Sequence, residues 1–273
     1  MFPASVLFST IAIGSGVSGA LFFSPFFMLV VGLSPAQAVG AGLLTEVFGM
    51  GNGLRSYVKA KLVDYATAKW LLLGAVPTVV IGAIAADLIS DRILKAIFGL
   101  GLLALSGFLV FVRTPEECEP GEKPLAFIDR KSQDKGTTVV RGADGSVYEY
   151  RTCWRPPGVL MAAAGGLLTG MISAGLPEIS TTQLVVRCRV PPRVAVATSV
   201  FTLAIVAAAG AGIHALAAKP VWQVVGWSIP GVLLGSGLGS RIGKYMPAKT
   251  MEKALGVVFG AVGALVLALE FLI

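Results

Sequence analysis

The chain has 273 residues, of which 55% are hydrophobic and 14% are charged, and its formal net charge is +7. A soluble globular protein carries about 25% charged residues, so this composition excludes an ordinary water-soluble domain. No basic, aromatic-rich stripe accompanies the excess of Lys and Arg, which argues against a nucleic-acid partner. Three cysteines without metal-ligand spacing and a single histidine give no support for a metal or another cofactor.

The first apolar segment, residues 3–32, is followed by a small-residue stretch at 36–38 that resembles a signal-peptide cleavage site. The basic residues that precede the apolar core of a signal peptide are absent, and the stretch around Pro35 recurs near Pro192. We therefore interpret it as part of the mature structure. Gly, Ser and Pro interrupt residues 3–32, which predicts either one kinked span or a re-entrant hairpin of two short arms.

Six other stretches are apolar and long enough to cross a membrane as helices, at about 20 residues each. A second interrupted segment, residues 157–188, precedes the fourth of them and offers the same two choices. The six predicted spans are residues 36–56, 69–87, 94–113, 194–215, 220–241 and 253–272.

Residues 114–155 form a polar insert, because they hold 15 of the 37 charged residues of the chain. Within the insert, residues 137–140 and 147–150 flank an Asp144-Gly145 turn, which predicts a β-hairpin. A solvated linker with a small hairpin is favoured over a regulatory or partner-binding module.

The hydrophobic plan before the insert is repeated after it, at an offset of about 157 residues. Many transporters are built from such internal repeats. We predict an all-α polytopic membrane protein with a first transmembrane repeat (1–113), a soluble insert (114–155) and a second repeat (156–273). Each repeat would hold one interrupted segment and three transmembrane helices. The matching residues are Pro35, Ala38, Val39 and Thr45 in the first copy and Pro192, Ala195, Val196 and Thr202 in the second.

The positions of Lys and Arg decide between six and eight crossings, because these residues gather on the cytoplasmic side. If both interrupted segments span the membrane, the 22 Lys and Arg residues divide 13 to 9; if both are re-entrant, they divide 19 to 3. We therefore predict inverted repeats with a cytoplasmic insert and both termini outside. Glycines 231, 235 and 239 permit either a homodimer or packing within the chain.

Two acidic residues lie where a membrane interior is expected. Glu46 is in the middle of the span 36–56, and Glu178 lies at the break of the second interrupted segment. An ionisable side chain at this depth costs free energy and is functional by default. A low dielectric favours the protonated carboxyl, so either residue could exchange protons near neutral pH. We interpret both as proton-coupling residues; the alternative is a protonated Glu that caps a broken helix.

The two breaks also predict an anion site. A helix that begins inside the membrane offers unpaired N–H groups and the positive end of its dipole. Hydroxyl side chains add donors, and glycines let the backbone approach a ligand; the alternative is that these small residues pack helices. The predicted substrate-binding residues are Ser15, Gly16, Ser18, Ser24, Thr45, Ser173, Gly175, Ser180, Thr181, Thr182, Thr198, Ser199 and Thr202.

Three residues follow the second break. Arg187 and Arg189 either gather anions at the cytoplasmic mouth or anchor the segment at the lipid headgroups. Cys188 between them is interpreted as a buried apolar cysteine. The single histidine, His214, is interpreted as a helix-end residue rather than a ligand.

Several runs of the sequence are distinctive in their order and spacing: residues 14–19, Pro25, 32–35, 38–40, 55–64, 170–178 and 192–199. Together they resemble the TauE/SafE (DUF81) sulfite exporter family. The resemblance covers nearly the whole chain except the insert. It implies export of small sulfur-containing anions, such as sulfite or organosulfonates, across a bacterial-type plasma (inner) membrane.

The leading hypothesis is a secondary-active carrier that binds a small anion between the two breaks and couples to protons. A proton or cation pathway through the same two carboxylates is the alternative within transport. A non-transporting membrane sensor or scaffold that signals through the insert is the alternative from another class. The sequence contains no nucleophile–base pair or metal cluster, so we do not expect an enzyme.

Overall fold

The computed structural model describes residues 1–15, 17–111, 137–151, 155–217, 221–242 and 248–271. This part of the chain is mainly helical, with one two-stranded antiparallel sheet, in agreement with the predicted all-α class and its β-hairpin. The elements are α1 (Phe2–Ser15), α2 (Ala20–Leu29), α3 (Pro35–Lys59), α4 (Tyr65–Leu88), α5 (Asp91–Phe111), β1 (Thr137–Arg141), β2 (Val147–Arg151), α6 (Arg155–Ile172), α7 (Leu176–Thr182), η2 (Gln183–Arg187), α8 (Pro192–Ala217), α9 (Trp222–Ile242) and α10 (Ala248–Phe271).

The six predicted spans correspond to the long helices α3, α4, α5, α8, α9 and α10. Local chemistry explains where two of them begin. The Ser34 hydroxyl accepts the Gln37 N–H at 3.4 Å at the start of α3, and Asp64 accepts the N–H groups of Ala66 and Thr67 at the start of α4. Among the described residues, α4 and α8 combine sufficient length with a mean hydropathy of 2.1, as a membrane span requires.

Each interrupted segment consists of two helices. In the second break, Ser173 has φ 57° and Gly175 has φ 116°. This left-handed region ends a right-handed helix. The chain then turns into α7, which continues into η2, a single π-helical turn. Three long helices follow each interrupted segment, so the order of elements is the same on both sides of the sheet.

Close contacts through glycine hold the bundle together. A Cβ atom on Gly82 of α4 would lie 2.4 Å from the Leu167 carbonyl oxygen of α6, so these two backbones touch. Gly231, Gly235 and Gly239 of α9 contact the backbone or Cβ atoms of α1 in the same way. This glycine face therefore serves packing within the chain, and it is not available for a homodimer.

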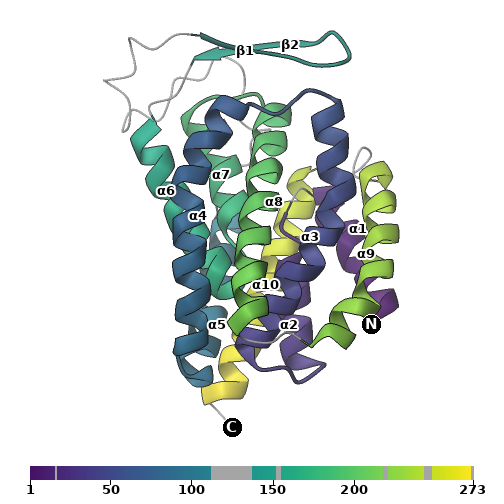
Figure 1. Cartoon of the computed structure of the whole chain (residues 1–273), viewed down its shortest axis with the longest axis vertical. Coiled ribbons are helices and arrows are strands. Elements are labelled where there is room, and N and C mark those ends of the chain that lie inside the picture. Colours follow the sequence, from purple (N-terminus) through teal and green to yellow (C-terminus); the bar gives the residue numbers. More distant parts are fainter. Residues whose placement is uncertain (16, 112–136, 152–154, 218–220, 243–247, 272–273) are drawn as a thin grey trace.

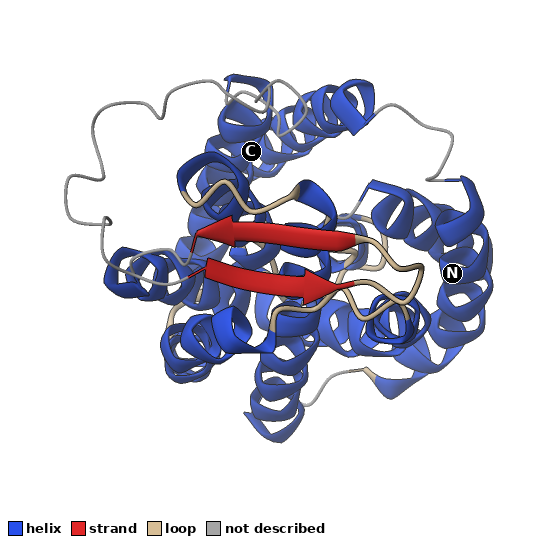
Figure 2. Cartoon of the chain, turned by 90° about the horizontal axis from the view of Figure 1, so that it is seen from above, coloured by secondary structure: helices blue, strands red, loops and turns tan. Residues whose placement is uncertain are grey.

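The sheet is the predicted hairpin, with Gly145 at φ 82° in its turn. It lies across one end of the bundle, whereas the start of α1 and the end of α10 lie toward the other end (Figure 1); Figure 2 shows it from above. The Ala143 N–H donates to the Ala60 carbonyl at 2.9 Å, and the Tyr150 hydroxyl donates to Asp64 at 2.8 Å. These two hydrogen bonds dock the hairpin on the α3–α4 junction, while residues 143–145 of its turn are exposed.

The hairpin also contacts the beginning of α8. Hydrogen bonds with Ser146 and Arg193 lower the pKa of the Tyr148 hydroxyl. Next to this contact, the Asp64 N–H donates to Thr198 Oγ1 of α8 at 3.0 Å. Because α3 ends and α8 begins at the hairpin, the two helices run in opposite directions (Figure 1).

We expect Tyr150→Phe to weaken the docking of the hairpin by about 1.5–3 kcal/mol, because it removes a hydrogen bond to a charged group. Hydrogen exchange measured by mass spectrometry should then be about tenfold faster, or more, at the β1 amides. Glu149→Gln, on an exposed position of β2, is the control and should leave exchange unchanged. Wild-type protection in Tyr150→Phe would show that backbone contacts alone hold the hairpin.

The same contact has a predictable pH dependence. Burial and the neighbouring Asp64 carboxylate raise the pKa of Tyr150 above its ordinary value of 10.0. Because the pKa is raised in the docked state, the contribution of Tyr150 to the free energy of docking is complete below pH 10 and declines as the pH rises further. The protection of the β1 amides, relative to unprotected amides at the same pH, should therefore be insensitive to this group at neutral pH and fall above about pH 10.

Candidate functional site

The two breaks meet inside the bundle, and Glu178 joins them. Its Oε1 accepts the Ser18 N–H of the first break at 3.1 Å, and its Oε2 accepts the Gly175 N–H of the second break at 3.1 Å. The side chain is buried, with 6% of the residue exposed. Glu178 is the third residue of α7, a position from which a carboxylate reaches back to cap its own helix.

Glu46 of α3 binds the first break from the other side. Its Oε1 lies 2.7 Å from Ser18 Oγ and 2.8 Å from the Gly19 nitrogen, both of which donate to it. Glu46 is 2% exposed. Ser18 therefore donates its backbone N–H to one carboxylate and its hydroxyl hydrogen to the other.

Two more serines complete the contact between the breaks. Ser24 Oγ of α2 lies 2.5 Å from Ser173 Oγ, and both residues are fully buried. A Cβ atom on Gly42 of α3 would lie 2.2 Å from Ser24 Oγ, so glycine at this position makes room for the serine pair. We call Ser18, Gly19, Ser24, Glu46, Ser173, Gly175 and Glu178 the tip cluster.

In the tip cluster, carboxylates of the chain already bind the N–H groups at the starts of two helices. The N–H groups of Ser18 and Gly19 precede α2, and that of Gly175 precedes α7. Each is bonded to a carboxylate, and the helix dipole adds to this attraction. The cluster can therefore bind negative charge on its backbone donors, and it contains two groups that can take up protons.

Other predicted site residues make bonds elsewhere. The hydroxyls of Thr45 and Thr202 donate to carbonyls one turn earlier in their own helices. Thr198 accepts the Asp64 N–H near the hairpin. Ser180 and Ser199 are buried, and their hydroxyls have no hydrogen-bond partner among the described residues.

The remaining predicted residues lie around the cluster. Thr181 and Thr182 are partly buried at the end of α7. Ser15 is the last residue of α1, and Gly16 lies outside the described residues. Arg189 is exposed, at φ 51°. Arg187 lines a separate cavity. Cys188 is buried, as predicted, and it is disulfide-bonded.

Two contributors to the site, Gly19 and Thr169, were not predicted from the sequence. The Gly19 N–H donates to Glu46, and Thr169 Oγ1 accepts the Leu176 N–H behind the second break. His214 does lie in the last turn of α8, as predicted, but it is fully buried. Its Nε2 lies 2.9 Å from the Gly170 carbonyl oxygen and its Nδ1 lies 3.7 Å from Asp87. Of Gly19 and Thr169, only Gly19 had a signal in the sequence, because it is one of the small residues that interrupt the first apolar segment.

The cluster offers little free space and no metal site. Glu46 and Gly19 also line a cavity of about 10 Å³, the volume that one water molecule needs. Among the described residues, no three His, Cys, Asp or Glu side chains gather closely enough to hold a metal ion. The structure therefore has the tip cluster closed, with its donors bonded within the chain.

Interrupted helices that meet around buried carboxylates, inside a bundle of apolar helices, are typical of membrane transporters. A profile of the sulfite exporter TauE/SafE family matches residues 1–266, and the chain belongs to this family. The resemblance seen in the sequence is confirmed.

One relative and the family agree on the general activity. The chain is 26% identical to the probable membrane transporter protein YunE of Bacillus subtilis (strain 168) over 263 residues, which cover 95% of this chain and 92% of the relative. No solved structure matches the chain significantly. The chain is a membrane transporter, and membership of a transporter family supports the expectation that it is not an enzyme.

Proposed function

We propose that the chain is a secondary-active exporter of small sulfur-containing anions, sulfite or organosulfonates, which binds its substrate at the tip cluster and couples transport to protons. The observation that carries this proposal is the set of backbone N–H groups of Ser18, Gly19 and Gly175, aimed at the carboxylates of Glu46 and Glu178. These donors suit an oxyanion of any kind. The family name favours sulfite among them.

The carboxylates occupy the donors that a substrate anion needs. A substrate oxyanion must therefore replace at least one carboxylate, and two negative groups in an apolar interior repel each other. Protonation of Glu46 or Glu178 weakens its hold on the N–H groups and removes the repulsion. Anion binding and proton binding then favour each other, which is the thermodynamic requirement for coupled transport.

The pattern of helix contacts supports inverted repeats, 1–113 and 156–273, around this site. If α1, α3, α4 and α5 correspond to α6, α8, α9 and α10, the main contacts between long helices have counterparts. The pair α4–α6 matches α9–α1, α4–α8 matches α9–α3, and α3–α8 and α5–α10 match themselves. Corresponding helices α3 and α8 run in opposite directions (Figure 1). We infer that α1–α2 and α6–α7 are re-entrant hairpins whose ends meet at mid-membrane, where Ser180, Thr181, Thr182, Ser199 and the predicted threonines can join the site as it opens.

The orientation of the transporter rests on charge. In the re-entrant arrangement of the sequence, 19 of the 22 Lys and Arg residues share the side of the insert, which argues for a cytoplasmic insert and for termini outside the plasma membrane. The disulfide at Cys188 argues for the opposite, because disulfides persist in oxidising compartments. We follow the charge count, since a reducing cytoplasm opens one disulfide without reversing the orientation of the chain.

The direct test is sulfite flux into proteoliposomes that contain an internal pH dye, with and without an imposed pH gradient. Proton movement that depends on sulfite is the expected result. Ethanesulfonate and taurine replace sulfite in parallel samples, and protein-free liposomes are the control. Movement of protons or cations regardless of the anion present would instead establish the cation pathway and overturn the anion carrier.

A further inference from the structure

A second cavity lies apart from the tip cluster, with which it shares no residue. It has a volume of about 110 Å³ and lies between the starts of α4 and α6, the turn η2 and the strand β1. None of the described residues that line it is acidic, and two of them, Arg155 and Arg187, are basic. The Asp64 carboxylate lies behind the lining residue Thr67, and it accepts hydrogen bonds from the hydroxyls of Thr67 and Tyr150.

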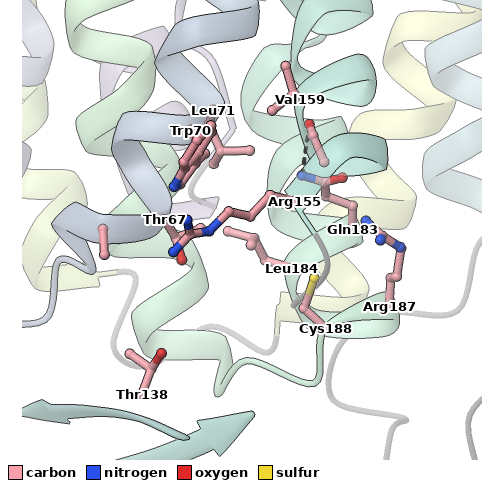
Figure 3. A pocket seen from close by; sticks show the side chains of 12 residues that line it. Thr67, Trp70, Leu71, Thr138, Arg155, Val159, Gln183, Leu184, Arg187 and Cys188 are labelled. Carbon is pink, nitrogen blue, oxygen red and sulfur yellow. Dashed lines mark hydrogen bonds between the residues drawn. The ribbon is translucent and has the colours of Figure 1, made fainter. Parts of the chain in front are cut away.

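The two arginines lie on opposite sides of this cavity. Figure 3 shows Arg155 next to Trp70 on one side, Arg187 next to Gln183 on the other, and Leu184 between them. The Arg155 guanidinium lies 4.6 Å from the centre of the Trp70 ring. Stacking on a ring holds a guanidinium in place and leaves the N–H groups at its edge available to an anion.

Gln183 gives an independent sign of a polar ligand. Its side chain is buried, with 3% of the residue exposed, and it lines the cavity. Its Nε2 reaches the Gly158 carbonyl only at 3.5 Å, and its Oε1 has no hydrogen-bond partner among the described residues. The amide N–H groups are therefore held only weakly within the chain, and an oxyanion in the cavity would accept from Nε2.

We propose that this cavity binds an anion with two charged groups joined by a short apolar link, one group on Arg155 and the other on Arg187, with the link against Leu184. Two sources have this chemistry. One is a water-soluble organic disulfonate, and the other is a lipid headgroup with two phosphates. Trp70, 38% exposed at the end of an apolar helix, places the cavity near the lipid headgroups.

The insert is part of this site. Thr138 of β1 lines the cavity, and β1 is held there by the contacts of Tyr150 and Ala143 with the α3–α4 junction. Ligand binding and docking of the hairpin should therefore stabilise each other. This proposal goes beyond the transport activity and does not depend on it, since no tip residue takes part.

The test is a titration of the purified full chain in neutral detergent, with the melting temperature as the readout. The soluble probes are ethane-1,2-disulfonate and its singly charged counterpart ethanesulfonate. The lipid probes are cardiolipin, with two phosphates, and phosphatidylglycerol, with one. We expect one doubly charged probe to reach its half-maximal shift at about tenfold lower concentration, or less, than its singly charged counterpart.

Arg155→Gln and Arg187→Gln should each abolish the preference for two charges, because each removes one anchor. Lys69→Gln removes an exposed positive charge of α4 outside the cavity and should keep the preference. Arg155 is exposed, so its replacement is compatible with folding, and the melting temperature without ligand checks this. A preference in the soluble pair alone, the lipid pair alone, or both supports the site and identifies the source.

Two results would overturn the proposal. One is the absence of any preference for the doubly charged probes in the wild type. The other is an equal loss in Lys69→Gln, which would indicate a general effect of surface charge. Glu178→Gln should bind as the wild type does, so a failure of this site and a failure of the proposed transport mechanism can be told apart.

Discussion

Glu178→Gln should remove most of the net proton-coupled transport while anion exchange across the membrane survives. The glutamine amide cannot take up a proton, so the linkage between anion and proton is lost. Its single oxygen also replaces two carboxylate oxygens, and its NH₂ group faces a backbone N–H of Ser18 or Gly175 that it cannot accept. We expect net flux driven by a pH gradient to fall about 5- to 150-fold, the range of ordinary coupling free energies.

The measurement compares two assays on the same proteoliposomes: net sulfite uptake driven by a pH gradient, and exchange of labelled for unlabelled sulfite at equal pH. Glu270→Gln is the matched control, because Glu270 is a carboxylate of α10 that pairs with Lys95 at 2.8 Å, outside the tip cluster. Full proton-coupled flux in Glu178→Gln would show that the carboxylate has no coupling role. Loss of both assays would assign Glu178 to substrate binding alone.

Gly82→Ala should destabilise the fold more than any conservative surface change. The new Cβ atom would lie 2.4 Å from the Leu167 carbonyl oxygen, and backbone atoms cannot move aside as a flexible side chain can. Overpacking of this kind costs about 1–3 kcal/mol. The melting temperature should therefore fall by roughly 2–12 °C, since each kcal/mol corresponds to about 2–4 °C in a chain of this size.

Gly226→Ala is the matched control. Gly226 lies in α9, where an added Cβ atom has no neighbour within 4 Å, and alanine favours a helix over glycine. This variant should melt at the wild-type temperature or slightly above it. Equal melting temperatures for the two variants, measured in the same detergent, would mean that α4 and α6 are not in backbone contact at Gly82.

The long helices and the acidic residues were accessible from the sequence because they follow from the cost of polar groups in an apolar medium. Because of that cost, Glu46 and Glu178 stood out as candidates for the site. The interruption of two apolar segments predicted the breaks near Ser18 and Ser173. The hairpin was predicted from its turn residues, Asp144 and Gly145, because turn chemistry is local.

Other parts of the site could not be predicted, since they depend on contacts between distant residues. The donor at Gly19 is its backbone N–H, which every residue except proline carries, so the residue type does not reveal it. Thr45 and Thr202 match in the repeats, but their hydroxyls bond to their own helices, an option open to any helical threonine. The contact of Tyr150 with Asp64 joins residues 86 positions apart, and no local pattern predicts such a partner.

The contacts beneath the hairpin also bear on which parts of the molecule can move. Asp64, from the first half of the sequence, is bonded both to Tyr150 of the hairpin and to Thr198 of the second half. The ends of α3, α4 and α8 are thereby fastened to one another. During alternating access they should travel as one rigid body, and the hinge would fall between this body and the other helices rather than between the two halves of the sequence.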